Sequence, residues 1–503
     1  MWNKGFKILT IVVILLFFYS CIKTTTYIAP IESDKINAAK KIIVVMKDGT
    51  ELELRNVYIE EEKIIGFTKD KTRKEIDFSL VKSVRIEKLN TYYAFLYGGV
   101  AIVAALLVYG AATAPKPPPS GSCPFIYSFD GEKYMFDAEP YGGAICQGLK
   151  RTEWCELENL KEINGQYRIL VINELDETQY TDELKLVVVD HPKGVKVVPD
   201  ASGKIHTISQ PMIPIQAYDQ KGRDIMPSIS ENDWKFWVAR TEEKNPERNE
   251  DLRDELIFEF HKPEGATKAK LLFNGCNTLW GSQALKRYLD LYGNKVSEWY
   301  EEMNSFGPAF FRMRNTHVRE ELYSLQVRVE TEDGWKSKAL IIGGGPFISE
   351  DKIYTLNIND VPGDMLRIKL TPPVAFWMIN HLAVDYTEDL PVTVTEIEAI
   401  KAIDHKGQDI RETLALEDNS YLVMPKIGDS AELIFRSPPQ SYGMDRSVFV
   451  KASGYYDIHL KAEGKPQLEL LNKLHTEPGF VVQHAFREYL KWKKENMEKI
   501  KQK

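Results

Sequence analysis

Residues 217–225 read AYDQKGRDI, and residues 402–410 read AIDHKGQDI. Both fit the pattern AxDxKGxDI, which has six fixed positions in nine residues. Each copy follows two predicted strands, "YRILV" and "LKLVVVDHP" before the first and "LRIKL" and "HLAVDY" before the second. Lys-Gly at the centre indicates a hairpin turn, because glycine tolerates the positive φ of tight turns. The repeat predicts two equivalent hairpins in duplicated β-sandwich-type domains.

The repeat also carries acidic residues, which raise the question of a metal site. Asp219, Asp224, Asp404 and Asp409 could be calcium ligands, since Ca²⁺ takes several oxygen ligands. However, carboxylates beside a turn are usually solvated, and the dense ligand series of a known Ca²⁺ loop is absent from the sequence. We therefore predict a structural role for these residues, with no metal and no cofactor.

The region around the repeat has β character, with short strands and tight turns. It opens with "CPFIYSFDGEKYMFDAEPYGGAI", in which Asp130-Gly131 joins two strands that share an aromatic face. This opening resembles a domain of uncharacterised exported bacterial proteins, and the resemblance implies a fold but no activity. The predicted divisions are β-sandwich-like domains at residues 123–240 and 255–465, a helix at 282–303 inside the second, and a C-terminal helical segment at 466–503.

The first 21 residues have the three parts of an export signal. Lys4 and Lys7 precede an apolar run of 12 residues, which is shorter than a membrane span, and Ser20-Cys21 ends it. The ending resembles a bacterial lipoprotein signal, which implies that Cys21 is lipidated and becomes the mature N-terminus. Phe18 and Tyr19 depart from the residues that this signal prefers, so an uncleaved anchor helix is the alternative.

Three further segments precede the large region. Residues 25–90 alternate short β runs with turns and predict a small SH3-like β-barrel. Residues 91–114 carry no charge, are long enough to cross a bilayer, and have small residues four apart. Residues 115–122 form a Pro-rich linker. The sequence therefore predicts a membrane-associated helix at 91–114, with a buried core helix as the alternative.

The signals for topology conflict. An export signal places residues 22–90 outside the cytoplasm, and a second crossing would return the rest of the chain to it. Seven Lys and Arg residues between positions 69 and 88 favour the opposite orientation. We predict a lipid-anchored protein of the bacterial cell envelope, with residues 115–503 outside the cytoplasm and residues 91–114 in contact with the bilayer.

Composition and motifs narrow the function class. The chain has 503 residues and a net charge of −8, which argues against a nucleic-acid partner. Cys123, Cys146, Cys155 and Cys276 lack zinc-type spacing, so a free thiol or one disulfide is expected rather than a metal site. The usual hydrolase, metalloprotease and phosphate-loop motifs are absent, and Gly343-Gly344-Gly345 indicates only a turn.

The favoured function is therefore binding without catalysis. The strand "DWKFWV" displays Trp234 and Trp237 on opposite faces, one of which is core while the other could contact a ligand. We predict a membrane-anchored lipoprotein that binds a partner protein or an envelope polymer through its β domains. The alternatives are an envelope hydrolase that acts on glycans through two carboxylates and a purely structural envelope protein.

Overall fold

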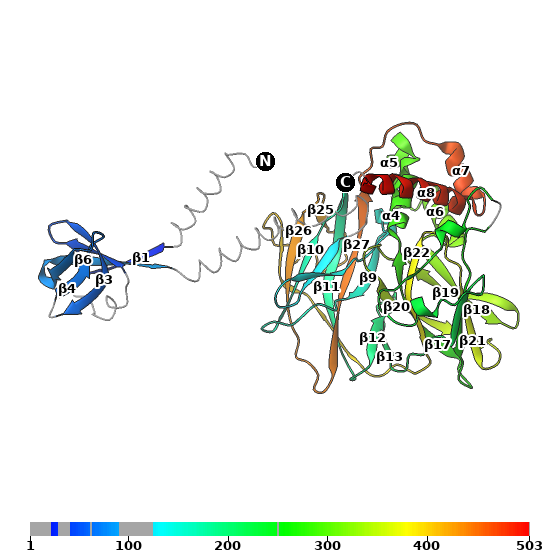
Figure 1. The fold of residues 1–503 in the computed structure, drawn as a ribbon, viewed down its shortest axis with the longest axis horizontal. Helices are drawn as coiled ribbons and strands as arrows, with labels where there is room; N and C mark the ends of the chain where they lie inside the picture. Colours follow the sequence, from blue (N-terminus) through cyan, green and yellow to red (C-terminus); the bar gives the residue numbers. More distant parts are fainter. Residues whose placement is uncertain (1–21, 29–40, 61–62, 90–123, 249–250, 502–503) are drawn as a thin grey trace. The chain divides into compact units, whose positions relative to one another are not determined.

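The computed structural model describes residues 22–28, 41–60, 63–89, 124–248 and 251–501 (Figure 1). The chain divides into two compact units, Met1–Lys116 and Pro117–Lys503. Both are built mainly from strands, as the sequence predicted. The expected lipidation site at Cys21, the linker at 115–122 and the predicted helix at 91–114 lie outside the described residues.

The described residues of the smaller unit form one six-stranded antiparallel sheet. Its order is β1 (Ile22–Ile28), β6 (Val81–Leu89), β2 (Lys41–Met46), β3 (Glu51–Glu60), β4 (Lys63–Phe67) and β5 (Arg73–Asp77). The prediction of an SH3-like barrel for residues 25–90 is corrected, because the described strands form an open sheet with β1 and β5 at its edges. Four of the five residues of β5 are exposed, and the same four are charged, which suits a solvated edge.

The larger unit contains two pairs of facing sheets. In the first pair, one sheet has the order β24 (Ala399–Asp404), β26 (Ser430–Arg436), β10 (Gln166–Ile172), β7 (Phe125–Phe129) and β8 (Tyr134–Ala138). The facing sheet has the order β23 (Thr393–Ile397), β11 (Glu177–His191), β27 (Asp445–Ile458) and β9 (Arg151–Glu156), and β25 (Leu422–Met424) also pairs with β11. Alternate apolar residues of both sheets form one core between them.

The second pair follows the same plan. One sheet has the order β14 (Gln216–Asp219), β16 (Leu256–His261), β21 (Met365–Leu370), β18 (Ser324–Thr331) and β19 (Gly334–Ile342). The facing sheet has the order β15 (Trp237–Val238), β22 (Trp377–Asp385), β17 (Lys268–Asn277) and β20 (Glu350–Asn357). A separate hairpin of β12 (Lys196–Pro199) and β13 (Ile205–Ile208) follows β11 and precedes β14 in the chain.

Strands that hold the same place in the two pairs come in a different chain order. Strands β24 to β27 correspond to β14 to β17, and β7 to β11 correspond to β18 to β22. The first pair is thus assembled from both ends of the larger unit, and the second pair from the middle. The sequence predicted one domain at residues 123–240 and the other at 255–465, each as a continuous segment. In the structure, the segment that forms the second sheet pair is inserted between the two segments that form the first.

The two copies of AxDxKGxDI occupy corresponding edge strands, β14 and β24, and fold into the same turn. The Gly222 amide donates to the Asp219 carbonyl at 2.8 Å, and the Gly407 amide donates to the Asp404 carbonyl at 2.9 Å. Both glycines have positive φ, 72° and 78°. The carboxylates of Asp219 and Asp404 each accept two backbone amides of their own turn, so they hold the turns together.

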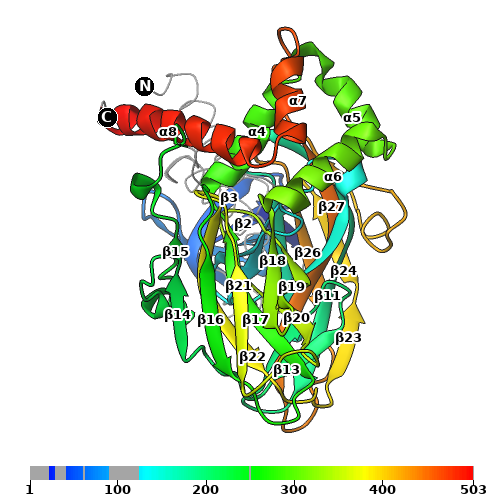
Figure 2. The same cartoon turned by 90° about the vertical axis from the view of Figure 1, so that its right-hand side faces the viewer.

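The described α-helices of the larger unit lie at one end of the facing sheets (Figure 2). They are α4 (Leu279–Asp290), α5 (Val296–Asn304), α6 (Pro308–Glu320), α7 (Leu468–Thr476) and α8 (Phe480–Lys501). The predicted helix at 282–303 is divided into α4 and α5 near Gly293, whose φ of 49° is left-handed. The buried Phe486 ties α8 to the core of the second sheet pair. No helix in the described parts of the chain combines the length and apolar character that a bilayer crossing requires.

Candidate binding groove between the sheet pairs

Two glycine loops meet where the sheet pairs adjoin. Residues 141–143 (YGG) connect β8 to β9, and residues 343–345 (GGG) make the corresponding connection from β19 to β20. A Cβ atom on Gly142 would lie 2.4 Å from the Gly345 backbone nitrogen. A Cβ atom on Gly345 would lie 2.0 Å from the carboxyl carbon of Glu139. At Gly142 the neighbouring backbone leaves no room for a side chain, and at Gly345 the space is taken by the Glu139 carboxyl group.

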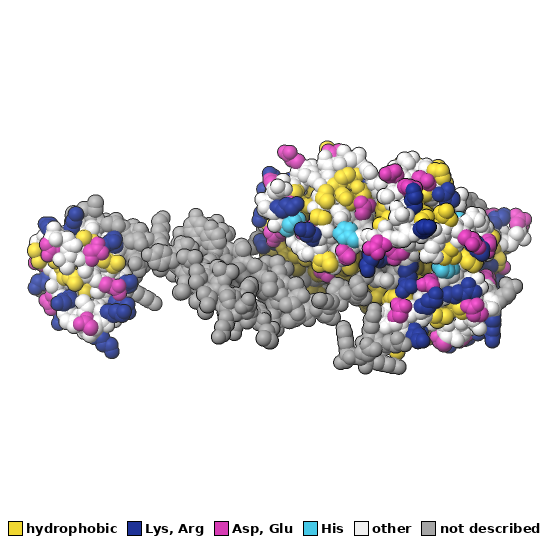
Figure 3. Space-filling model, turned by 90° about the horizontal axis from the view of Figure 1, so that it is seen from above, with side chains coloured by type: hydrophobic (Ala, Val, Ile, Leu, Met, Phe, Trp, Pro, Cys, Tyr) yellow, Lys and Arg dark blue, Asp and Glu magenta, His cyan; other side chains and the backbone are white. Residues whose placement is uncertain are grey.

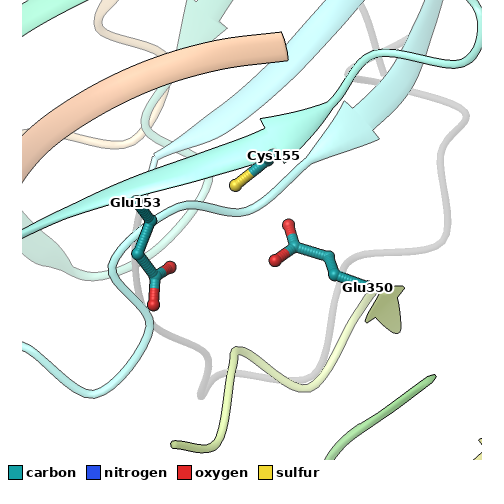
Figure 4. Close-up of side chains that lie close together, drawn as sticks. All are labelled: Glu153, Cys155 and Glu350. Carbon is teal, nitrogen blue, oxygen red and sulfur yellow. The ribbon is translucent and has the colours of Figure 1, made fainter. Parts of the chain in front are cut away.

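A polar cluster lies beneath the loops, on the edge strands β9 and β20. Glu153, Cys155 and Glu350 each place one possible metal-ligand atom within 4.8 Å of the others. Figure 4 shows Glu153 and Cys155 on one strand and Glu350 on another, with the three side chains close together. Glu153 also accepts the Tyr141 amide at 2.7 Å and the Arg151 Nε at 2.9 Å.

Burial sets the ionisation of this cluster. Burial, the neighbouring Glu350 and the neighbouring Glu153 raise the pKa of the Cys155 thiol well above its ordinary value. Burial also raises the pKa of Glu350 to about 7. Burial opposes ionisation of Glu153 as well, but Arg151 and Lys352 outweigh it and lower that pKa. The thiol is therefore protonated at neutral pH, with its sulfur within 4.8 Å of a Glu350 carboxyl oxygen.

This ionisation decides what the cluster can do chemically. The three side chains could hold a cation such as Zn²⁺, but Arg151 and Lys352 already supply positive charge, with Lys352 Nζ 3.8 Å from Glu153. A protonated, buried thiol is a poor nucleophile. The geometry favours a structural link between β9 and β20.

A groove opens above the glycine loops, and we call it the junction groove. Its volume is about 330 Å³. It lies between the first sheet pair, the second sheet pair and helices α4 to α6, and most of its walls are apolar. The lining residues include Leu149, Leu285, Met303, Phe310, Met313, Val318, Tyr323, Leu340, Ile342 and Tyr456.

The charges that line the junction groove are positive. Arg151 and Arg314 are among its lining residues, whereas none of the Asp and Glu residues that the structure describes is. Arg151 is engaged with Glu153. Arg314 is exposed on α6 and has no ion pair within the described ranges. The groove therefore presents an apolar wall with a cation at its rim.

Exposed hydrophobic side chains extend the groove onto the surface. Phe310 lines the groove, and its ring centroid lies 5.0 Å from that of Phe306 and 5.6 Å from that of Phe311. Phe306 is 58% exposed and Phe311 is 54% exposed. Figure 3 looks onto the helix-bearing end of the larger unit, where hydrophobic side chains gather in patches among charged ones. Apolar surface of this kind marks interaction sites.

The structure separates the two tryptophans that the sequence suggested for binding. Trp237 is 8% exposed, pairs with Ile379 and belongs to the core of the second sheet pair. Trp234 is 65% exposed and has a φ of 64°. Neither residue lines the junction groove.

The sequence predicted a free thiol or one disulfide among the four cysteines of the larger region. Cys146, Cys155 and Cys276 are buried and free, so no disulfide joins the described cysteines, and Cys123 lies outside them. Sequence reasoning missed Arg314 and the glycine loops as parts of a site. The paired glycine runs were the available signal, but their meeting depends on sheets far apart in the chain.

Comparisons with known proteins add little. No protein family model matches the chain, and no curated protein matches it. Among solved structures, the secreted serine protease VesC from Vibrio cholerae is 6% identical over 70% of this chain and 75% of its own, with a TM-score of 0.14. A likeness this weak carries no argument about fold or activity.

Proposed function

We propose that this protein is a membrane-anchored, non-catalytic binding protein of the bacterial envelope, built on duplicated β-sandwich domains. Its binding site is the junction groove, and its ligand is apolar and carries an anionic group. The apolar walls favour such a ligand over a neutral glycan polymer, which needs many hydrogen-bond partners.

One observation carries this proposal. The junction groove of about 330 Å³ joins apolar walls to positively charged lining residues, and no carboxylate of the described part of the chain lines it. An anionic group at the rim is attracted by Arg314, while its apolar part is removed from water. The position of the groove between two sheet pairs and three helices is typical of small-molecule sites.

The dye 1-anilinonaphthalene-8-sulfonate, an apolar anion whose fluorescence rises in an apolar site, tests the groove. We expect saturable binding to the full chain, and Arg314→Gln should weaken it about three- to tenfold, as for a charge-assisted contact. Arg312→Gln is the matched control, because Arg312 lies on the same helix and does not line the groove. Equal binding by wild type and both variants would show that the dye does not use the groove.

The anchor is a separate part of the proposal. Residues 1–21 have the pattern of a lipoprotein signal, and residues 91–114 have the length and apolarity of a membrane segment. Mass spectrometry of the mature N-terminus should find a lipidated Cys21. An unmodified Met1 N-terminus would contradict lipid anchoring.

A hydrolase acting through two carboxylates is the second candidate function. One observation favours it: the pKa of Glu350 is raised while that of Glu153 is lowered, as in acid–base pairs. Against it, neither carboxylate lines the junction groove, so a glycan has no access to them there. Glycan turnover that Glu153→Gln abolishes would establish the hydrolase.

A further inference from the structure

A second cavity lies directly behind the junction groove, among helices α4, α6, α7 and α8. This inner cavity has a volume of about 60 Å³, roughly four to six times the space that one water molecule needs. Its walls are largely apolar, with Trp280, Ala284, Phe376, Leu474 and Ala485 among them. A cavity with such walls tends to stay dry and to accept apolar groups.

The two cavities share part of their lining. Leu285, Met313, His317 and Tyr323 belong to both. These side chains therefore lie between the groove and the inner cavity. The charged groups at the inner cavity are already paired, since Arg287 Nη1 donates to Glu488 at 2.8 Å.

The four shared side chains differ in how firmly they are held. The hydroxyl of Tyr323 donates to the Gly281 carbonyl at 2.7 Å, and its ring stacks on His317 with the centroids 5.0 Å apart. Leu285 and Met313 are buried in one core cluster and make no side-chain hydrogen bond with the described residues, but the unbranched thioether side chain of Met313 adopts other rotamers more readily than the branched Leu285. Met313 is therefore the side chain that can move aside to join the two spaces.

We propose that the junction groove and the inner cavity form one site for a single-chain amphiphile, namely a long-chain monocarboxylate. Its carboxylate lies at Arg314, and its alkyl tail passes Met313 into the inner cavity. This inference rests on the proposed function and names the ligand class for the same groove. The positively lined groove selects the head group, and the continuity of two apolar spaces selects a tail longer than the groove alone accommodates.

Chain length provides the test. Octanoate and hexadecanoate are used to displace the naphthalene sulfonate dye from the full chain. Each buried methylene contributes about 0.8 kcal/mol, so hexadecanoate should bind at least tenfold more tightly than octanoate. Hexadecanol should compete less well than hexadecanoate, and Arg314→Gln should remove that difference while Arg312→Gln keeps it.

A cavity-filling variant distinguishes the inner cavity from general hydrophobic binding. Ala284 lines the inner cavity and not the groove, so Ala284→Leu should remove the advantage of hexadecanoate and leave octanoate and dye binding unchanged. Ala485→Leu fills the same space from α8 and serves if the first variant does not fold. Ala339→Leu is the matched control, since Ala339 is also partly buried but lines neither space.

The outcomes separate this inference from the proposed function. Dye binding with equal affinities for the two carboxylates, or an unchanged preference for hexadecanoate in a folded cavity-filled variant, overturns the inference alone. Displacement of the dye only by apolar peptides with a free C-terminus overturns it in favour of a protein partner. Absence of dye and carboxylate binding overturns both proposals.

Discussion

At the scale of single residues, the buried cluster of Glu153, Cys155 and Glu350 shows how environment decides chemistry. A thiol and two carboxylates within 4.8 Å form a set that could bind a metal or carry out acid–base catalysis. Arg151 and Lys352 supply the opposing charge, and burial keeps the thiol protonated. The same residue types on an exposed surface would have different ionisation, so residue identity alone does not define the site.

Glu350 makes stability depend on pH in a predictable direction. Burial raises its pKa from 4.5 to about 7, so the folded protein holds this proton more tightly than the unfolded chain does. The stabilising contribution is complete below about pH 4.5 and is lost as the pH rises through 7. Relative to wild type, Glu350→Gln should gain about 2 kcal/mol in free energy of unfolding between pH 5 and pH 9.

Urea unfolding at several pH values measures this difference. The free energy of unfolding of the wild type varies with pH through every titrating group. The contribution of Glu350 is therefore the difference in this free energy between wild type and Glu350→Gln at each pH. Glu132→Gln, at an exposed hairpin turn, is the control substitution. Parallel stability profiles for wild type and Glu350→Gln would refute the prediction.

At the scale of elements, the glycine loops join the two sheet pairs. Gly142→Ala would place its Cβ 2.4 Å from the Gly345 nitrogen, a contact that the backbone has to move to relieve. We expect a loss of about 1–3 kcal/mol in free energy of unfolding. Gly344→Ala is the matched control, because its Cβ would meet only the flexible Lys352 ammonium, at 3.9 Å. Equal denaturation midpoints for the two variants would contradict this packing.

The repeated turns provide a second prediction at this scale. Asp219→Ala and Asp404→Ala each remove a carboxylate that accepts two backbone amides, and each should cost about 1–2 kcal/mol. Asp219 also bonds Arg223 Nε at 2.6 Å, so its loss should be the larger. Asparagine at either position keeps one acceptor oxygen and should recover part of the stability. Chemical denaturation checks both, and a calcium-dependent stability would instead favour metal binding.

At the scale of the whole molecule, nesting determines which pieces can fold. The core of the first sheet pair takes residues from strands at both ends of the larger unit, including β10, β26 and β27. Residues 123–240 alone lack β24 to β27, so half of that core is missing. We expect this fragment to show no cooperative unfolding by circular dichroism, whereas residues 117–503 unfold cooperatively. A well-dispersed amide NMR spectrum of the fragment would disprove the nested arrangement.

Much of this arrangement could be read from local sequence. Strand character, the Asp-Gly and Lys-Gly turns and the C-terminal helix follow from propensity and periodicity over a few residues. The AxDxKGxDI repeat located two corresponding turns, because identical residues at the same spacing make the same local hydrogen bonds. The division of the predicted helix at Gly293 was also signalled by the glycine itself.

Which strands become partners was decided by tertiary structure. The strand β10 pairs with β26, which is more than 250 residues away in the chain. The sequence of a strand does not identify the strand that it pairs with, because backbone hydrogen bonds are alike in every strand. For the same reason the sequence could not bring Arg314 near the glycine loops, or show that Trp237 lies in a core while Trp234 does not. Sequence by itself determined the local elements and the repeated turns. Folding determined the nested sheets and the groove, because both depend on contacts between segments that are distant in the chain.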